Sequence, residues 1–165
     1  MPAFLSQYIE VCLFGREGNS AQYLLLQRSA TEKVYPAMWQ IITAKIEAGE
    51  TALQAAQREI AEETSLIPLE MWNVPFVNSF YDVKRDAISF IPLFAAEVPL
   101  FATPALSEEH QQFVWLSFEE AKEKLVWNGQ RQGLSIVQEF IVGKKSRKDV
   151  QEFQLCLMDN IFSLH

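Results

Sequence analysis

The sequence contains little cysteine, histidine or glycine and no long uncharged apolar run. Its 165 residues include two cysteines, Cys12 and Cys156, and two histidines. Because no Cys/His pair has zinc-ligand spacing and the cysteines lie far apart, both are expected to fill the core. No stretch reaches the length of a membrane span, and residues 1–5 lack the pattern of a signal peptide. The sequence therefore predicts a soluble, cytoplasmic protein without a membrane partner.

Positive charge is also scarce. Lysine and arginine total 14 against 21 aspartates and glutamates, which gives a formal net charge of −7. Non-specific binding of nucleic acid requires a basic surface, so that class of protein is disfavoured. A negatively charged nucleotide could bind an acidic site only if cations bridged the two. The balance of charge thus already indicates metal dependence.

The length and composition indicate one domain with a packed core. Hydrophobic residues make up 49% of the chain and aromatic residues 12%, which is ample for a core of ordinary size. Hydrophobic patterning and turn residues predict a mixed sheet with helices on both faces, an α/β fold. The expected strands lie within 4–14, 23–27, 38–43, 72–83, 87–96 and 113–116, and the expected helices span 51–64, 117–125 and 130–142.

A change of composition near residue 143 predicts a boundary. The basic run 144–148 follows it, and then apolar residues recur at helical spacing at Val150, Phe153, Leu157 and Ile161. We therefore expect one domain over 1–143, followed over 144–165 by a basic joint and an amphipathic C-terminal helix. That helix could pack on its own domain or on a second subunit, forming a homodimer.

The helix expected over 51–64 carries a cluster of carboxylates. Its N-terminus is marked by Thr51 and Gln54, which have the spacing of a capping box. At 100° per residue, three glutamates fall on one face, where like charges repel by about 0.2–0.5 kcal/mol per pair. These are Glu59, Glu62 and Glu63.

Other side chains of this helix are expected to point elsewhere. Arg58 is predicted to lie on a different side from the three glutamates, and Leu53, Ala56 and Ile60 form an apolar stripe suited to packing on a sheet. Two interpretations of the acidic face remain at this point: a solvated surface, or a site for a hard cation such as Mg²⁺, which prefers carboxylate oxygens.

The surrounding window, from Ala44 to Leu66, resembles the Nudix box, G-x5-E-x7-R-E-U-x-E-E-x-G-U, in which U is a bulky aliphatic residue. Every charged position of the pattern is present, and the match is far longer than an isolated E-x-x-E. The matching residues are Glu50, Arg58, Glu59, Ile60, Glu62, Glu63 and Leu66. Ala44 and Ser65 stand where the family has glycine, which tolerates positive φ better than either.

The resemblance, which covers residues 3–142, implies an α/β/α Nudix sandwich and hydrolysis of a diphosphate linkage by water. It implies Mg²⁺, with Mn²⁺ as a substitute, on three carboxylates and one backbone carbonyl. These ligands would come from Glu59, Glu62, Glu63 and Ala44. Arg58 is expected to hold a carboxylate in place, that of Glu50.

The general base is expected on the loop before the strand at 113–116, where several Nudix members carry a carboxylate. Glu109 is the candidate, Glu108 could replace it, and either could instead be a plain surface carboxylate. His110 is expected to be a hydrogen-bonded loop residue rather than the base.

The substrate is predicted from a second resemblance. Residues 39–44 resemble the W-Q-x-V-T-G lead-in of bacterial dihydroneopterin triphosphate pyrophosphatases, also called dATP pyrophosphohydrolases, which implies pyrophosphate release from a nucleoside or pterin triphosphate. Trp39, Gln40 and Asn128 are candidates to contact the base or pterin, and Arg28 a phosphate. Trp39 could instead belong to the core and Arg28 to the surface.

Two alternatives stay open. Residues 106–111 with Trp115 and Leu116 resemble the asymmetric diadenosine tetraphosphate hydrolases, although the P-x-G lead-in of that group is absent. A Nudix domain can also bind nucleotides without hydrolysing them, usually after losing carboxylates of the box, and here all are present.

Overall fold

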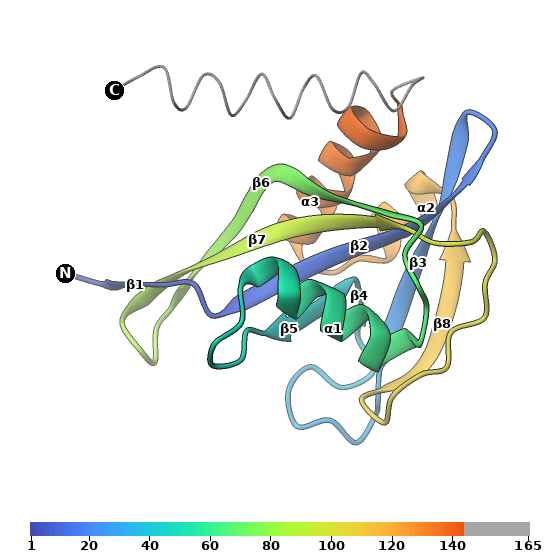
Figure 1. The fold of residues 1–165 in the computed structure, drawn as a ribbon. Coiled ribbons are helices and arrows are strands. Elements are labelled where there is room, and N and C mark those ends of the chain that lie inside the picture. The colour runs from blue at the N-terminus through green and yellow to red at the C-terminus, as the bar shows by residue number, and fades with distance from the viewer. Residues whose placement is uncertain (144–165) are drawn as a thin grey trace, which may run out of the picture.

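Eight strands form one mixed sheet in the computed structural model, which describes residues 1–143 (Figure 1). Along the sheet, hydrogen-bonded neighbours follow the order β1 (Ala3–Leu5), β7 (Ala87–Glu97), β2 (Tyr8–Glu17), β3 (Ser20–Arg28) and β4 (Trp39–Gln40). Three further strands pair with members of this path: β5 (Ile42–Lys45) with β2, β6 (Glu70–Asp82) with β7, and β8 (His110–Leu116) with β3. Among the strand pairs of the described residues, the two parallel ones both involve β7, which pairs with β1 and with β2.

Helices cover both faces of the sheet. α1 (Ala52–Thr64) lies on one face, and α2 (Phe118–Lys124) and α3 (Asn128–Val137) lie on the other, with a π-helical turn (Gln138–Val142) continuing α3 (Figure 1). Alternation along β2 supplies both cores: Val11 and Leu13 belong to the core under α1, whereas Cys12 and Phe14 belong to the core under α3. The predicted α/β/α sandwich is confirmed, and Cys12 fills the core as expected.

Local sequence signals explain where α1 begins and ends. Thr51 Oγ1 accepts a hydrogen bond from the Gln54 N–H at 3.2 Å, and Gln54 Oε1 accepts one from the Thr51 N–H at 2.9 Å, so the capping box is confirmed. The helix ends at Ser65, whose φ of 55° lies in the left-handed region. Serine thus keeps the backbone that glycine would favour. Ala44 lies in β5, paired with Ile9, and needs no positive φ.

Two expectations about α1 and its lead-in are wrong. The single strand expected over 38–43 is split at Ile41, because β4 pairs with β3 while β5 pairs with β2, filling the fork where those two strands part. Leu53 is 45% exposed, and Ala55 is buried instead. Ala56 and Ile60, the other two residues of the predicted stripe, are buried. The buried face of α1 therefore includes Ala55 in place of Leu53, which brings it closer to the glutamates.

The predictions for the C-terminus lie outside the described residues. These are the basic joint and amphipathic helix over 144–165, the homodimer formed through that helix, and the core position of Cys156. Within residues 1–143, none of the helices is long and apolar enough to cross a membrane.

A buried polar network joins α3 to the sheet. Glu10, only 3% exposed, accepts hydrogen bonds from Gln130 Nε2 at 3.1 Å and from Asn78 Nδ2 at 3.3 Å. Gln130 Nε2 also donates to Thr43 Oγ1 at 3.0 Å, which connects α3 to β5. Burial raises the pKa of Glu10, and the two amide donors only partly offset that effect. The network fixes α3 against strands that lead to α1, at the cost of a buried acid.

Replacing Glu10 by glutamine should stabilise the protein in a pH-dependent way. Because the folded-state pKa is raised above the ordinary value of 4.5, Glu10 supports folding at low pH, and that contribution is lost as the pH rises through the folded-state pKa. Glu10→Gln should therefore raise Tm by a few degrees at about pH 8, and the gain should shrink toward about pH 4. Thermal unfolding at both pH values, followed by circular dichroism, measures it; an equal gain at both would contradict the explanation.

Candidate active site

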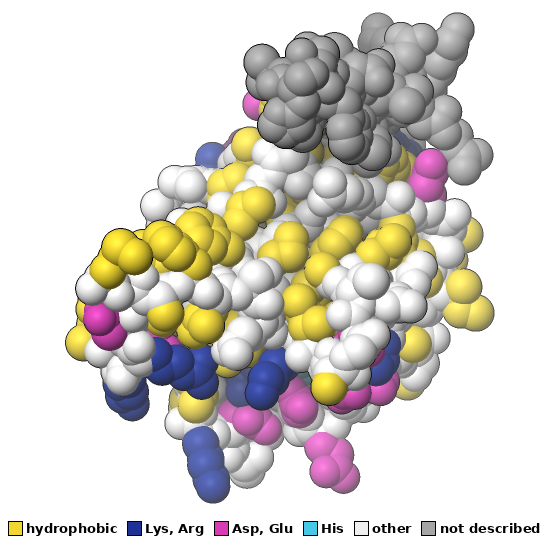
Figure 2. Space-filling model, turned by 60° about the vertical axis from the view of Figure 1, so that its left-hand side comes forward, with side chains coloured by type: hydrophobic (Ala, Val, Ile, Leu, Met, Phe, Trp, Pro, Cys, Tyr) yellow, Lys and Arg dark blue, Asp and Glu magenta, His cyan; other side chains and the backbone are white. Residues whose placement is uncertain are grey.

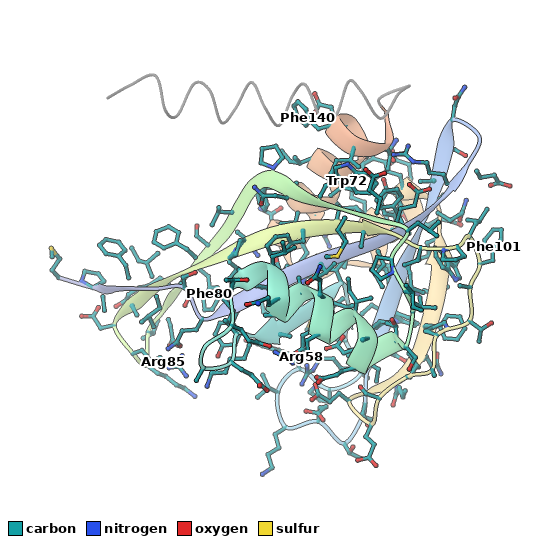
Figure 3. All side chains as sticks on the ribbon, viewed as in Figure 1. Arg58, Trp72, Phe80, Arg85, Phe101 and Phe140 are labelled. Atoms are coloured by element: carbon teal, nitrogen blue, oxygen red, sulfur yellow. The ribbon has the colours of Figure 1, made fainter. Side chains whose placement is uncertain are left out.

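Arg58 organises the carboxylates around α1 (Figure 3). Its guanidinium donates to both oxygens of Glu50, from Nε at 2.6 Å and from Nη2 at 3.0 Å, which confirms the expected bond. Nη1 donates to Glu59 at 2.5 Å and to Glu62 at 3.0 Å, and Nη2 also reaches the carbonyl oxygen of Lys45 at 3.2 Å. The expectation that Arg58 points away from the glutamates is wrong, because its long side chain reaches both the adjacent Glu59 and Glu62, one turn along the helix.

Glu63 lies apart from this group. It is 4% exposed and points into the protein, and its Oε2 has no hydrogen-bond partner among the described residues. Burial raises the pKa of Glu63 to about 8, and the negative charges of Glu59 and Glu109 add to the effect. The most buried carboxylate of the box is therefore the one whose charge is least compensated.

His110, the first residue of β8, lies next to Glu63 of α1. Its Nδ1 lies 3.9 Å from Glu63 Oε2, and its Nε2 lies 3.4 Å from the amide nitrogen of Gln40. Burial lowers the pKa of His110 to about 4, with a further contribution from the positive charge of Arg28. The expectation that His110 is a loop residue is wrong, because it begins β8. By alternation it would share the face of Val114 and Leu116 under α3, and the register shift between Gln27 and Arg28 brings it to the α1 face instead.

The structure brings Glu109 next to the box. Glu109 is exposed, and its charge contributes to the raised pKa values of both Glu59 and Glu63. The loop that carries it is bonded to the residue that follows β3, because the Ser29 N–H donates to the Glu109 carbonyl oxygen at 2.7 Å. The charge of Glu108 is not among the causes of the raised pKa of Glu59 or of Glu63.

Arg28 lies near the acidic face but is held by its own loop. Its Nε donates to the Val34 carbonyl oxygen, and its Nη2 bonds Glu32, each at 3.0 Å. Its charge lowers the pKa of Glu63, although less than the surrounding effects raise it. Contact with a phosphate thus remains a prediction that requires Arg28 to share or release these partners.

The candidates for binding a base divide between the two faces of the sheet. Trp39 packs against the core under α3, and Lys124 Nζ lies 4.7 Å from its ring centroid. Asn128 is exposed at the first turn of α3, after Trp127, which contacts Tyr35 edge to face at 4.9 Å. Gln40 points the other way, toward His110. Trp39 and Asn128 share one face, while Gln40 belongs with the carboxylates.

The donor set fits a divalent cation by its chemistry. Within residues 1–143, no three His, Cys, Asp or Glu side chains are grouped closely enough to hold a metal ion, because Arg58 bonds Glu59 and Glu62 while Glu63 turns inward. Three carboxylates nonetheless lie within one turn of helix, and one of them has a buried oxygen without a partner. Carboxylate oxygens are the ligands of hard cations. Figure 2 shows acidic and basic side chains gathered along one edge of the molecule.

Comparisons with known proteins agree with this arrangement. A family model described as the NUDIX domain matches residues 8–135. An octanoyltransferase of Myxococcus xanthus is 31% identical over 131 residues, which cover 75% of this chain and 34% of that protein. The chain thus spans about a third of the length of that relative. The nucleoside triphosphatase NudI of Escherichia coli is 27% identical over 109 residues, covering 62% of this chain and 77% of that protein.

Solved structures share the fold. An Ap4A hydrolase of C. elegans, solved as a binary complex, has a TM-score of 0.69 at 20% identity, covering 85% of this chain and 100% of that chain. The dihydroneopterin triphosphate pyrophosphohydrolase of E. coli has a TM-score of 0.65 at 22% identity, covering 85% of this chain and 99% of that chain.

Replacing Glu63 by glutamine should separate stability from cation binding. Removing a buried charge that faces other carboxylates should raise Tm in the absence of divalent cations above about pH 8. The same change should reduce the rise in Tm that Mg²⁺ produces in the wild-type chain. Differential scanning calorimetry with and without Mg²⁺ measures both effects, and a Glu63→Gln protein with an unchanged Mg²⁺ response would exclude Glu63 as a ligand.

Proposed function

The chain belongs to the Nudix family, and we propose that it is a pyrophosphohydrolase that hydrolyses a nucleoside or pterin triphosphate and releases pyrophosphate. The observation that carries this proposal is the group of box carboxylates gathered around Arg58, with Glu63 and Glu109 beside them. The resemblance of residues 39–44 to the dihydroneopterin triphosphate pyrophosphatases supports the choice of substrate, as does the match to a nucleoside triphosphatase.

A divalent cation, Mg²⁺ or Mn²⁺, would be held by Glu59, Glu62 and Glu63 with the carbonyl oxygen of Ala44. When bound, it neutralises phosphate charge and makes water a better nucleophile. Arg58 keeps the first two carboxylates in place by charge-assisted hydrogen bonds and fixes the preceding loop through Glu50. The part of the site around Arg58 is thus built before substrate arrives.

The remaining residues bind substrate and handle the proton. Trp39 and Asn128 lie on the α3 face, where an aromatic ring and an amide can contact the base or pterin, and Arg28 lies near enough to the carboxylates to contact a phosphate. Water attacks phosphorus, the bond to the pyrophosphate oxygen breaks, and the Glu109 carboxylate takes the proton of the water.

A panel of compounds tests the substrate. With Mg²⁺, dATP and dihydroneopterin triphosphate should yield pyrophosphate and the monophosphate at a higher kcat/KM than diadenosine tetraphosphate, and Glu62→Gln should reduce kcat by about 10²-fold or more. Products are identified by chromatography and coupled pyrophosphate detection. Preferred formation of ATP from diadenosine tetraphosphate would instead favour the activity for which the C. elegans structure is named. No turnover of any compound would refute the proposal.

Neighbouring glutamates provide a matched test of the base. Glu109→Gln should lower kcat by roughly 10²–10⁴-fold with little change in KM, because its carboxylate lies beside the box. Glu108→Gln, also exposed and one residue earlier, should retain activity within a few fold. Steady-state kinetics of both variants decide the assignment, and the reverse order of losses would transfer the role to Glu108.

A further inference from the structure

Two buried polar atoms without partners face each other behind the box. Among residues 1–143, Glu63 Oε2 and His110 Nδ1 are both buried and neither has a hydrogen-bond partner. They lie 3.9 Å apart, and the exposed fractions of the two side chains are 5% and 0%. An unpaired buried polar atom destabilises a fold by about 1–3 kcal/mol. Two such atoms aimed at one another indicate an interaction that is completed in another state of the site.

The other side of the imidazole fixes which nitrogen carries the proton. His110 Nε2 lies 3.4 Å from Gln40 Nε2. An amide nitrogen only donates, so His110 Nε2 accepts, and the neutral ring carries its hydrogen on Nδ1. The nitrogen that carries the hydrogen is therefore the one that lies 3.9 Å from the unpaired oxygen of Glu63.

The other carboxylates of the box already have such a donor. Arg58 donates to Glu59 and Glu62, which leaves one oxygen of each able to bind a cation. Carboxylates that ligate metal ions are usually hydrogen-bonded by a further residue, whose loss weakens metal affinity by about 10–100-fold. Glu63 lacks this partner among the described residues, and His110 is the donor that faces it.

We propose that His110 is a positioning residue for Glu63. Its Nδ1–H donates to Glu63 Oε2 when the carboxylate is engaged by a cation, which leaves Oε1 as the ligand. The gap must shorten by about 1 Å to reach hydrogen-bond distance. Gln40 orients the ring, so its function in this chain is structural support of His110 rather than contact with the base. This inference rests on the proposed function only in requiring that the box binds a divalent cation.

Three substitutions test the proposal in the full chain without substrate. His110→Leu removes the donor and should weaken binding of Mn²⁺ by about 10–100-fold. His110→Asn places an amide N–H near the position of Nδ1 and should restore affinity to within a few fold. Ser107→Ala is the matched control, because its Oγ is also buried and unpaired in the turn that precedes His110, and its affinity should equal that of the wild type. Free Mn²⁺ is measured by electron paramagnetic resonance, and Mg²⁺ binding by calorimetry.

A second measurement needs no substitution that could impair folding. With only two histidines in the chain, the ring nitrogens of His110 can be assigned by ¹⁵N NMR. The spectrum should show the Nδ1–H form, and saturating Mg²⁺ should shift the Nδ1 resonance as the hydrogen bond forms.

The outcomes separate this inference from the proposed function. If the wild type binds cations and His110→Leu binds them equally well, or if the Nδ1 resonance does not move, the role of His110 is refuted while the proposed function stands. If the wild type binds neither Mn²⁺ nor Mg²⁺ and hydrolyses no diphosphate, the proposed function itself fails.

Discussion

The charge of one arginine holds the active-site region together. Arg58 bonds three carboxylates and the carbonyl oxygen of Lys45, so it connects α1 to the loop before it as well as to its own neighbours on the helix. Without that guanidinium, Glu50, Glu59 and Glu62 would repel one another at the start of the site. The bidentate contact with Glu50 also depends on the planar fork of arginine, which lysine lacks.

Glu63 obeys a different constraint. Its environment is set by the core rather than by Arg58, because α1 is rotated so that Ala55, Ala56 and Ile60 pack on the sheet. That rotation carries Glu63 inward to His110 and leaves Glu62 in solvent, with 59% of its side chain exposed. Adjacent glutamates thus have opposite surroundings. Glu62 is exposed and bonded to Arg58, whereas Glu63 is buried with an oxygen that has no partner among the described residues. Sites of this kind reduce the stability of a fold in exchange for binding.

Much of this could be predicted from the sequence, since the signals are local. A capping box marked Thr51, hydrophobic patterning marked the buried strands, and the spacing of the box identified its glutamates. The errors arose where contacts distant in sequence decide the outcome. Leu53 is exposed because a neighbouring face of α1 packs on the sheet. Arg58 bonds Glu50 in the preceding loop, and this contact places its guanidinium beside Glu59 and Glu62. The pairing of His110 with Glu63 joins residues 47 positions apart, so no local pattern could reveal it.

The short strand β4 carries a consequence for how such enzymes diversify. Its two residues point into different layers: Trp39 toward α3, and Gln40 toward His110 and the carboxylates. Strand geometry enforces this separation whatever the side chains are. Substitutions of Trp39 therefore alter the α3 face, while Gln40 and the carboxylates on the other face keep their surroundings. Variation at the first residue of this strand therefore need not disturb the geometry of the acidic face.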